Sequence, residues 1–182
     1  MTSSSELTAP LRSSNATEVY SALIKIGKED HRELEAEIVP FLDSVHAELR
    51  SAAIRVLGFY WNLPAYRERT AEMVRSERDP DARSVAIMAW SSYYGDTKNV
   101  DVLKTLHALT LDTTQRLPVR AAAYSGMMVV SGIPATVATG ERGYQNHRRH
   151  RYPGTHPVER GRFFAAAVPR RRVHELSVAL RS

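Results

Sequence analysis

The side chains best suited to metal chemistry are three histidines in the last third of the chain. His147 and His150 stand three residues apart, a spacing that puts two imidazoles on one face of a helix, and His156 offers a third ligand. The residues next to the pair are Arg148, Arg149 and Arg151. Because their positive charges oppose a bound cation, we expect a solvated basic tract and no metal.

Patterns for nucleophilic catalysis are missing as well. The chain has no cysteine, which removes thiolate nucleophiles and cysteine-ligated metals. Ser125-Gly126 and Ser131-Gly132 both lack the glycine two residues before the serine that a hydrolase nucleophile turn needs. The sequence also has no glycine-rich phosphate-binding loop. We therefore expect a protein that is not an enzyme and carries no cofactor.

Charge is divided unevenly along the chain. Residues 1–132 hold 15 Lys and Arg against 17 Asp and Glu, a net charge of −2, and residues 133–182 hold 10 Arg and 3 Glu, a net charge of +7. Together they give the net charge of +5 of the whole chain. Nucleic-acid binding depends on clustered cations that face phosphates. We therefore expect nucleic acid as a partner only through the C-terminal segment.

The sequence does not indicate a membrane or secreted protein. Residues 121–140 carry no charge, but Pro134, three glycines and several hydroxyls make their hydropathy too low for a spanning helix. The first residues, MTSSSELTAPLRSS, lack the basic region followed by an apolar stretch of a signal peptide. We expect a cytoplasmic protein that contacts no membrane.

The first 132 residues contain a repeat whose length is typical of one unit of a helical solenoid. Four segments align without gaps, and the fourth residue of each is alanine. The intervals between these alanines are 31, 33 and 37 residues, close to the unit length of helical solenoids. The segments are VYSALIKIGKED at 19–30, RSAAIRVLGFYW at 50–61, RSVAIMAWSSYY at 83–94 and RAAAYSGMMVVS at 120–131, with Ala22, Ala53, Ala86 and Ala123 as the shared alanines.

Each repeat is predicted to be a helical hairpin. In the second segment Ala53, Ile54 and Leu57 fall on one face of a helix and do not alternate as in a strand. Asp79-Pro80 supplies a capping carboxylate and a first-turn proline to the third segment. A second apolar-periodic stretch precedes each of the last three segments. These stretches contain Leu34, Ile38, Phe41 and Leu42, then Tyr66, Met73 and Val74, then Val102, Leu103, Leu106 and Leu109.

The repeats resemble the HEAT-repeat family in its broad bacterial form. The matching residues are LDSVHAELRSAAIRVLG at 42–58, DPDAR at 79–83 and VRAAA at 119–123. The resemblance covers about residues 5–132. It implies an all-α fold, an α-α superhelix that forms a right-handed solenoid of about four helical hairpins. Because one scaffold of this kind hosts many functions, the resemblance is specific for architecture and not for activity.

The resemblance also implies a ladder of ion pairs along the repeats. An arginine leads each repeated helix and pairs with an aspartate of its own or a neighbouring unit. The first unit has Val19 at this position, which suits an N-terminal capping unit. The same arginines could instead bind an anion on the concave face, but we favour the structural role. The ladder arginines are Arg50, Arg83 and Arg120, and the candidate partners are Asp43, Asp79 and Asp112.

Aromatic residues are concentrated at the ends of the second and third repeated helices. Seven of the 14 aromatic residues lie within residues 59–94. Tyrosine and tryptophan are common anchors in protein interfaces because they bury a large area with few rotatable bonds. The alternative is that they seal the interior between the second and third hairpins. The candidate partner-binding residues are Tyr60, Trp61, Tyr66, Trp90, Tyr93 and Tyr94.

Residues 133–182 form a second region in which the hairpin pattern stops. This segment is basic and rich in Arg, Pro and Gly, which predicts a poorly ordered tail with a weak apolar period only in Val173–Leu180. Two interpretations stay open. The tail could be a basic arm, or it could be the product of a shifted reading frame in GC-rich DNA, of which 21 Arg against 4 Lys is typical.

These features together predict a non-enzymatic protein–protein interaction scaffold or adaptor. It would hold another protein on its concave face or on its aromatic edge. Compact bacterial proteins that look like this one include adaptors and toxin-neutralising immunity proteins. The alternatives are a nucleic-acid-binding protein that relies on the tail, and a HEAT-like alkylpurine DNA glycosylase, which the net negative charge of the repeat region disfavours.

Overall fold

The computed structural model describes residues 7–133, and all regular elements in that range are helical. The tail predicted for residues 133–182 lies outside the described residues apart from Ile133. The elements are η1 (Ala9–Arg12), α2 (Ala16–Lys28), η2 (Arg32–Leu34), α3 (Glu35–Ile38), η3 (Val39–Asp43), α4 (Ala47–Ile54), the π-helix η4 (Arg55–Tyr60), η5 (Pro64–Tyr66), α5 (Arg67–Ser76), α6 (Pro80–Ser92), α7 (Val100–Leu111) and α8 (Leu117–Val130).

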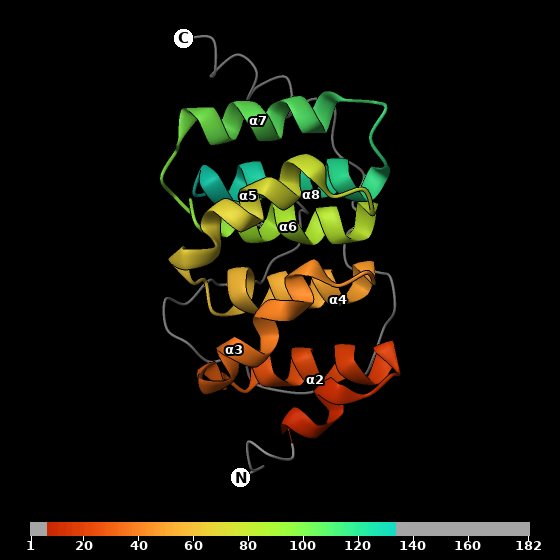
Figure 1. Cartoon of the computed structure of the whole chain (residues 1–182). Coiled ribbons are helices and arrows are strands. Elements are labelled where there is room, and N and C mark those ends of the chain that lie inside the picture. The colour runs from red at the N-terminus through yellow and green to blue at the C-terminus, as the bar shows by residue number, and fades with distance from the viewer. Residues whose placement is uncertain (1–6, 134–182) are drawn as a thin grey trace, which may run out of the picture.

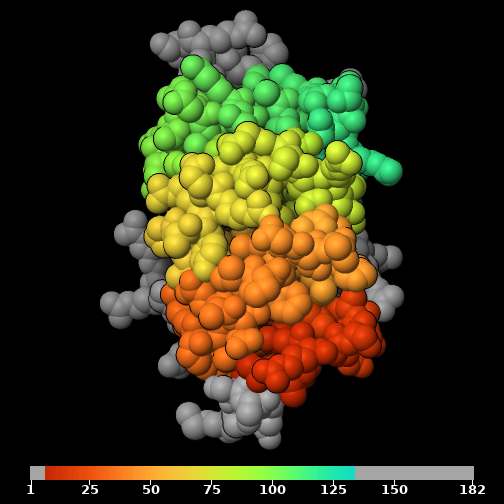
Figure 2. All heavy atoms as spheres, in the orientation of Figure 1, coloured from red at the N-terminus to blue at the C-terminus, as the bar shows by residue number. Residues whose placement is uncertain are grey.

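The helices that carry the shared alanines pack against one another in chain order. We call α2, α4 with its continuation η4, α6 and α8 the alanine helices. Each packs on the next, and η3, α5 and α7 pack on α4, α6 and α8 as companion helices. In Figure 1 the units follow one another from the N-terminal to the C-terminal end, with α5 passing in front of α6. The space-filling view of the same side shows them as consecutive bands (Figure 2).

Local sequence signals set where the helices begin. The Asp79 carboxylate accepts hydrogen bonds from the backbone N–H groups of Asp81 and Ala82, at 3.1 and 2.9 Å, and Pro80 is the first residue of α6. This confirms the predicted cap. Asn15 and Asn99 accept from backbone N–H groups at the starts of α2 and α7 in the same way. Such caps satisfy donors that the first helical turn leaves free.

Two predicted helices are irregular. The first companion stretch is divided among η2, α3 and η3. Pro40, the second residue of η3, has no N–H with which to continue the α-helix α3. The second alanine helix widens into the π-helix η4, where the N–H of Trp61 donates to the carbonyl of Val56 at 2.9 Å. Gly58, a poor helix former, lies in this widened turn.

One contact recurs at each junction between alanine helices. The fifth residue after a shared alanine lies against the third residue after the next shared alanine. A Cβ atom placed on Gly27 would stand 2.7 Å from Val56 Cγ2, one on Gly58 would stand 3.1 Å from Ala89 Cβ, and one on Gly126 would stand 2.2 Å from Ser91 Oγ. Each pair includes glycine, which lets the helices approach closely. We call these three pairs, Gly27–Val56, Gly58–Ala89 and Ser91–Gly126, the seam.

The core lies between the layer of alanine helices and the layer of companion helices, and along the seam. All four shared alanines are buried, and so are the residues that follow them. The apolar spacing that the sequence displays is therefore the spacing of the buried face. The fully buried large side chains are Leu23, Ile26, Ile38, Ile54, Val56, Leu57, Ile87, Leu106, Val119, Met127 and Val130, together with the threonine Thr70.

Candidate functional site

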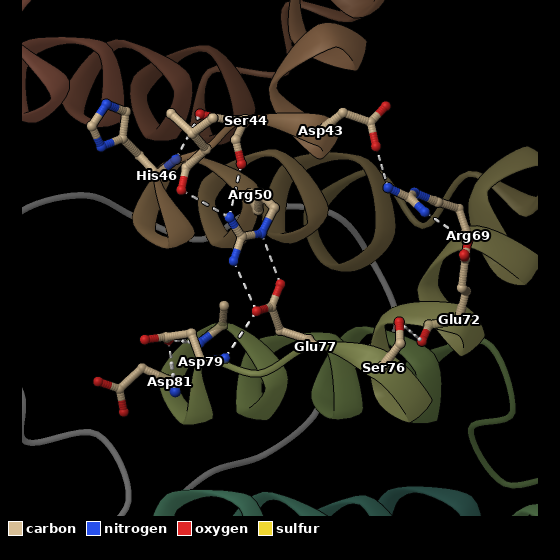
Figure 3. A network of polar contacts seen from close by, with 12 residues as sticks. Asp43, Ser44, His46, Arg50, Arg69, Glu72, Ser76, Glu77, Asp79 and Asp81 are labelled. Atoms are coloured by element: carbon tan, nitrogen blue, oxygen red, sulfur yellow. Dashed lines mark hydrogen bonds and ion pairs between the residues drawn. The ribbon is translucent and has the colours of Figure 1, made fainter.

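Arg50 is the centre of a polar network that joins two hairpins (Figure 3). Its Nε and Nη2 donate to the two carboxylate oxygens of Glu77, each at 2.8 Å, and its Nη1 donates to the carbonyls of Ser44 and Val45 at 2.8 and 3.2 Å. The side chains of Arg50 and Glu77 are only 21% and 6% exposed. The arginine holds the pKa of Glu77 below its ordinary value, so the pair is ionised at neutral pH.

The other two ladder arginines are also bound to protein groups. Arg83 Nε donates to the carbonyl of Val74 at 2.8 Å, and its Nη1 donates to Oε1 of Gln115 at 2.9 Å. Arg120 Nε donates to the carbonyl of Thr110 at 3.0 Å. In both cases the carbonyl belongs to the preceding companion helix. These bonds support the structural role of the arginines over anion binding, because the donors face backbone and side-chain acceptors of the fold.

The aspartates expected to pair with these arginines have other partners, so the predicted pairs need correction. Asp43 binds Arg69 on α5, and Asp79 is occupied by the helix cap. Asp112 accepts from the hydroxyl of Thr114 at 2.6 Å and from Gln115 Nε2 at 2.9 Å. It is therefore linked to Arg83 by hydrogen bonds through Gln115, without a direct hydrogen bond between the two. For Asp79 and Asp112 the physical reason is local competition, since a carboxylate just before a helix binds nearby N–H and O–H groups first.

Three of the six aromatic candidates hold neighbouring units together. Trp61 is only 4% exposed and belongs to the core, so it offers no surface to a partner. Tyr60 is half-buried and lies against Gly27 of α2. The hydroxyl of Tyr66 donates to Glu35 Oε1 at 2.6 Å, and burial together with this bond raises the pKa of Tyr66 to about 12. The interpretation that aromatics seal the interior fits these three residues.

The remaining three candidates form a cluster with an arginine that the sequence analysis did not single out. Trp90 and Tyr94 meet edge to face with ring centroids 5.7 Å apart. The guanidinium carbon of Arg67 lies 5.9 and 5.8 Å from the ring centroids of Tyr93 and Tyr94. Both are cation–π distances. We call Arg67, Trp90, Tyr93 and Tyr94 the aromatic edge.

The aromatic edge is anchored to the fold through Tyr93 and exposed to solvent at Arg67. The hydroxyl of Tyr93 donates to the carbonyl of Leu63 at 2.9 Å, and burial raises the pKa of Tyr93. All three rings are half-buried, whereas Arg67 is exposed. The Arg67 cation thus lies against two rings, and within residues 7–133 it forms no ion pair with a carboxylate. The arrangement can accept an anionic or apolar group from outside.

A second surface lies on the alanine helices, on the side away from their buried alanines. The residues two and six positions after each shared alanine are at least partly exposed in all four units. Because the helices lie side by side, these positions form one row, which we call the open face. The sequence alone does not reveal this row, because the residue types at these two positions differ among the four repeats. Its members are Ile24, Lys28, Arg55, Phe59, Met88, Ser92, Ser125 and Val129.

Comparison of the chain with protein-family models, curated proteins and solved structures found no match. Within residues 7–133, no helix has both the length and the apolar character needed to cross a bilayer. The same residues contain no group of three or more histidine, aspartate or glutamate side chains arranged to hold a metal ion. The histidines 147, 150 and 156 lie outside the described residues.

Proposed function

We propose that this chain is a non-enzymatic protein–protein interaction scaffold of HEAT-like hairpins, wound into a right-handed superhelix. The recurring seam supports the superhelix. The same two repeat positions meet in three successive pairs of units, so neighbouring units share one register, as expected when a repeated rotation and translation relates them in a superhelix. The handedness is carried by the resemblance to HEAT repeats.

The aromatic edge is the observation that carries the binding role. Tryptophan, tyrosine and arginine are the residue types that dominate the energetics of protein interfaces. Here Arg67 is already held against Tyr93 and Tyr94, so little side-chain entropy is lost when a partner binds. We infer a protein partner that places a carboxylate or a backbone carbonyl over Arg67 and an apolar side chain against Trp90.

Site-specific photo-crosslinking in the native host tests this proposal. A benzophenone amino acid in place of Tyr94 should give a covalent adduct with one protein, and the same group in place of Arg75 should not. Arg75 is exposed on α5, as Arg67 is. If neither position yields a protein adduct, or if the adduct at Tyr94 disappears after nuclease treatment, the protein-scaffold proposal fails.

Charge reversal of the two α5 arginines provides the matched comparison. Arg67→Glu should weaken capture of the crosslinked partner at least tenfold, because loss of an interface hot spot costs about 2 kcal/mol or more. Arg75→Glu changes the net charge by the same amount and should leave capture unchanged. Equal capture by both variants would remove the aromatic edge from the interface.

A further inference from the structure

A cavity of about 260 Å³ lies beside the Arg50–Glu77 pair, between the second and third hairpins. Its walls come from η3, α4, α5 and the loop that precedes α6. Figure 3 labels four of its lining residues, Arg50, Arg69, Ser76 and Glu77. Pockets for drug-sized ligands measure about 300–1,000 Å³, so this cavity suits a smaller group. None of its lining residues belongs to the aromatic edge, so the cavity is separate from the site of the proposed function.

The lining of the cavity has an excess of positive charge. Three arginines, Arg50, Arg69 and Arg78, stand against one carboxylate, Glu77, which gives the lining a net charge of +2. Arg50 and Glu77 neutralise each other through two hydrogen bonds of 2.8 Å. The excess charge therefore belongs to Arg69 and Arg78, and Arg50 keeps its structural role.

Both of these arginines can be reached by an anion. Arg78 is exposed and forms no ion pair within residues 7–133. Arg69 pairs with Asp43 and Glu72, whose side chains are 78% and 53% exposed and do not line the cavity. Because solvated ion pairs of this kind are weak, an anion in the cavity can compete with them for the guanidinium of Arg69.

The end of α5, which lies at this cavity, does not oppose an anion. The last carbonyls of a helix carry partial negative charge, and α5 ends at Ser76. Three of these carbonyls accept hydrogen bonds of between 2.8 and 3.0 Å from donors of the fold, among them Arg83 Nε on the carbonyl of Val74. Their negative charge is therefore offset before a ligand arrives.

The size of the excess charge indicates the class of anion. A phosphate monoester carries a charge of about −1.5 to −2 at neutral pH, which matches the lining, whereas a carboxylate would balance only half of it. Arginine also holds phosphate oxygens through paired N–H donors. The cavity has an apolar part as well, because Leu42 and Met73 line it. These two side chains can contact the carbon body of an organic phosphate.

We propose that this cavity binds the phosphate group of a small phosphate monoester, with Arg69 and Arg78 on the phosphate oxygens and Leu42 and Met73 against its apolar part. A free phosphate ion shares the charge and the acceptor oxygens of this ligand and is the other source of the same chemistry. Because the lining comes from two hairpins, the bound ligand would bridge them.

Isothermal titration calorimetry of the full chain with phenyl phosphate tests the proposal. At pH 7.5 and constant ionic strength, phenyl phosphate should bind about tenfold more tightly than phenyl sulfate, which has nearly the same shape but a single negative charge. Inorganic phosphate distinguishes the two sources: weaker binding than phenyl phosphate assigns the cavity to an organic phosphate, and equal or tighter binding assigns it to the free ion. Failure of both phosphates to bind, or equal affinities for phenyl phosphate and phenyl sulfate, would overturn the proposal.

A pair of arginine variants locates the binding. Arg78→Gln should weaken phenyl phosphate binding about tenfold, because it removes a charge-assisted donor from the cavity. Arg75→Gln removes the same charge from an exposed position of α5 that does not line the cavity, and it should leave the affinity unchanged. Both variants should unfold at the wild-type midpoint without phosphate. The same loss in both variants, or no loss in Arg78→Gln, would show that phosphate binds elsewhere.

Asp43→Asn gives a change in the opposite direction. It removes a carboxylate that competes for Arg69, so phenyl phosphate should bind about threefold more tightly than to wild type. A purely structural role of the Asp43–Arg69 pair would not raise the affinity. Unchanged or weaker binding to this variant would contradict the assignment of Arg69 to the phosphate.

Discussion

The bond between Arg50 and Glu77 supplies the sharpest test of how the hairpins are joined, through the substitution Glu77→Gln. The Glu77 carboxylate accepts two hydrogen bonds from Arg50 and a third from the backbone N–H of Asp79 at 2.9 Å. Glutamine has nearly the same shape, but it has no charge and only one acceptor oxygen. Its amide nitrogen would therefore face an arginine donor.

The expected cost follows from burial. Hydrogen bonds to charged groups contribute about 1.5–3 kcal/mol each, and removing one partner of a fully buried ion pair costs about 3–5 kcal/mol. Arg50 remains partly exposed and keeps its bonds to two backbone carbonyls, so its charge is not stranded. We expect Glu77→Gln to lower the free energy of unfolding by about 2–3 kcal/mol, measured by urea denaturation at pH 7.

The matched control is Asp43→Asn, which breaks another arginine–carboxylate pair between neighbouring units. The Asp43 side chain is 78% exposed, so its pair with Arg69 is solvated and the loss should be about 0.5 kcal/mol or less. If the two substitutions cost the same, or if Glu77→Gln costs less than about 0.5 kcal/mol, burial does not decide the strength of these pairs and the reasoning fails.

The pH dependence of this difference has a defined sign. The pKa of Glu77 is lowered from its ordinary 4.5, chiefly by the hydrogen bonds from Arg50. Its contribution is therefore fully present above pH 4.5 and is lost as the pH falls through the pKa of the folded state. The stability difference between wild type and Glu77→Gln should be constant from pH 7 to pH 5.5 and shrink below pH 4.5. A difference that grows on acidification would contradict the assignment.

Three further substitutions test packing and titration. In thermal unfolding, Gly27→Ala should lower the free energy of unfolding by about 1–3 kcal/mol at the midpoint, because the added Cβ would stand 2.7 Å from atoms of Val56 and Tyr60. Gly95→Ala is the control and should be tolerated, because its Cβ would meet no atom closer than 3.5 Å. Gly132→Ala should destabilise the chain by about 1–2 kcal/mol in urea unfolding, since Gly132 has φ +69° and lies against Asp96. Tyr66→Phe should remove the tyrosine that titrates near pH 12 in absorbance at 295 nm. Because the pKa of Tyr66 is raised from 10.0, its stabilising contribution is full below pH 10 and is lost toward pH 12, so wild type should lose its advantage over Tyr66→Phe in that range.

Helix placement was predictable from the sequence because its causes are local. The shared alanines and the residues beside them repeat at fixed positions. Asp79 is the N-cap of α6 and Pro80 is its first residue, so this pair marks where the helix begins. The four alanine helices are present and pack together as all-α hairpins. The π-helix was not predicted, because no residue pattern in the repeat distinguishes its widened turn from an α-helical one.

Side-chain partners were less predictable because they depend on loop conformation. Arg50 meets Glu77, 27 residues away, and passes over Asp43, which lies much nearer in the sequence. The sequence contains both carboxylates, but only the path of the loop between α5 and α6 turns one of them toward the guanidinium. For the same reason, composition could not show that Trp61 is core while Trp90 reaches the surface. Arg67 was overlooked because it belongs to no repeated position.

The seam explains why the shared alanines could be recognised in the sequence, whereas the closest helix–helix contacts could not. A close helix–helix approach needs space on only one side, so the small residue can belong to either partner. Gly27 makes room for Val56, whereas Gly126 makes room for Ser91, and no single column is small in every copy.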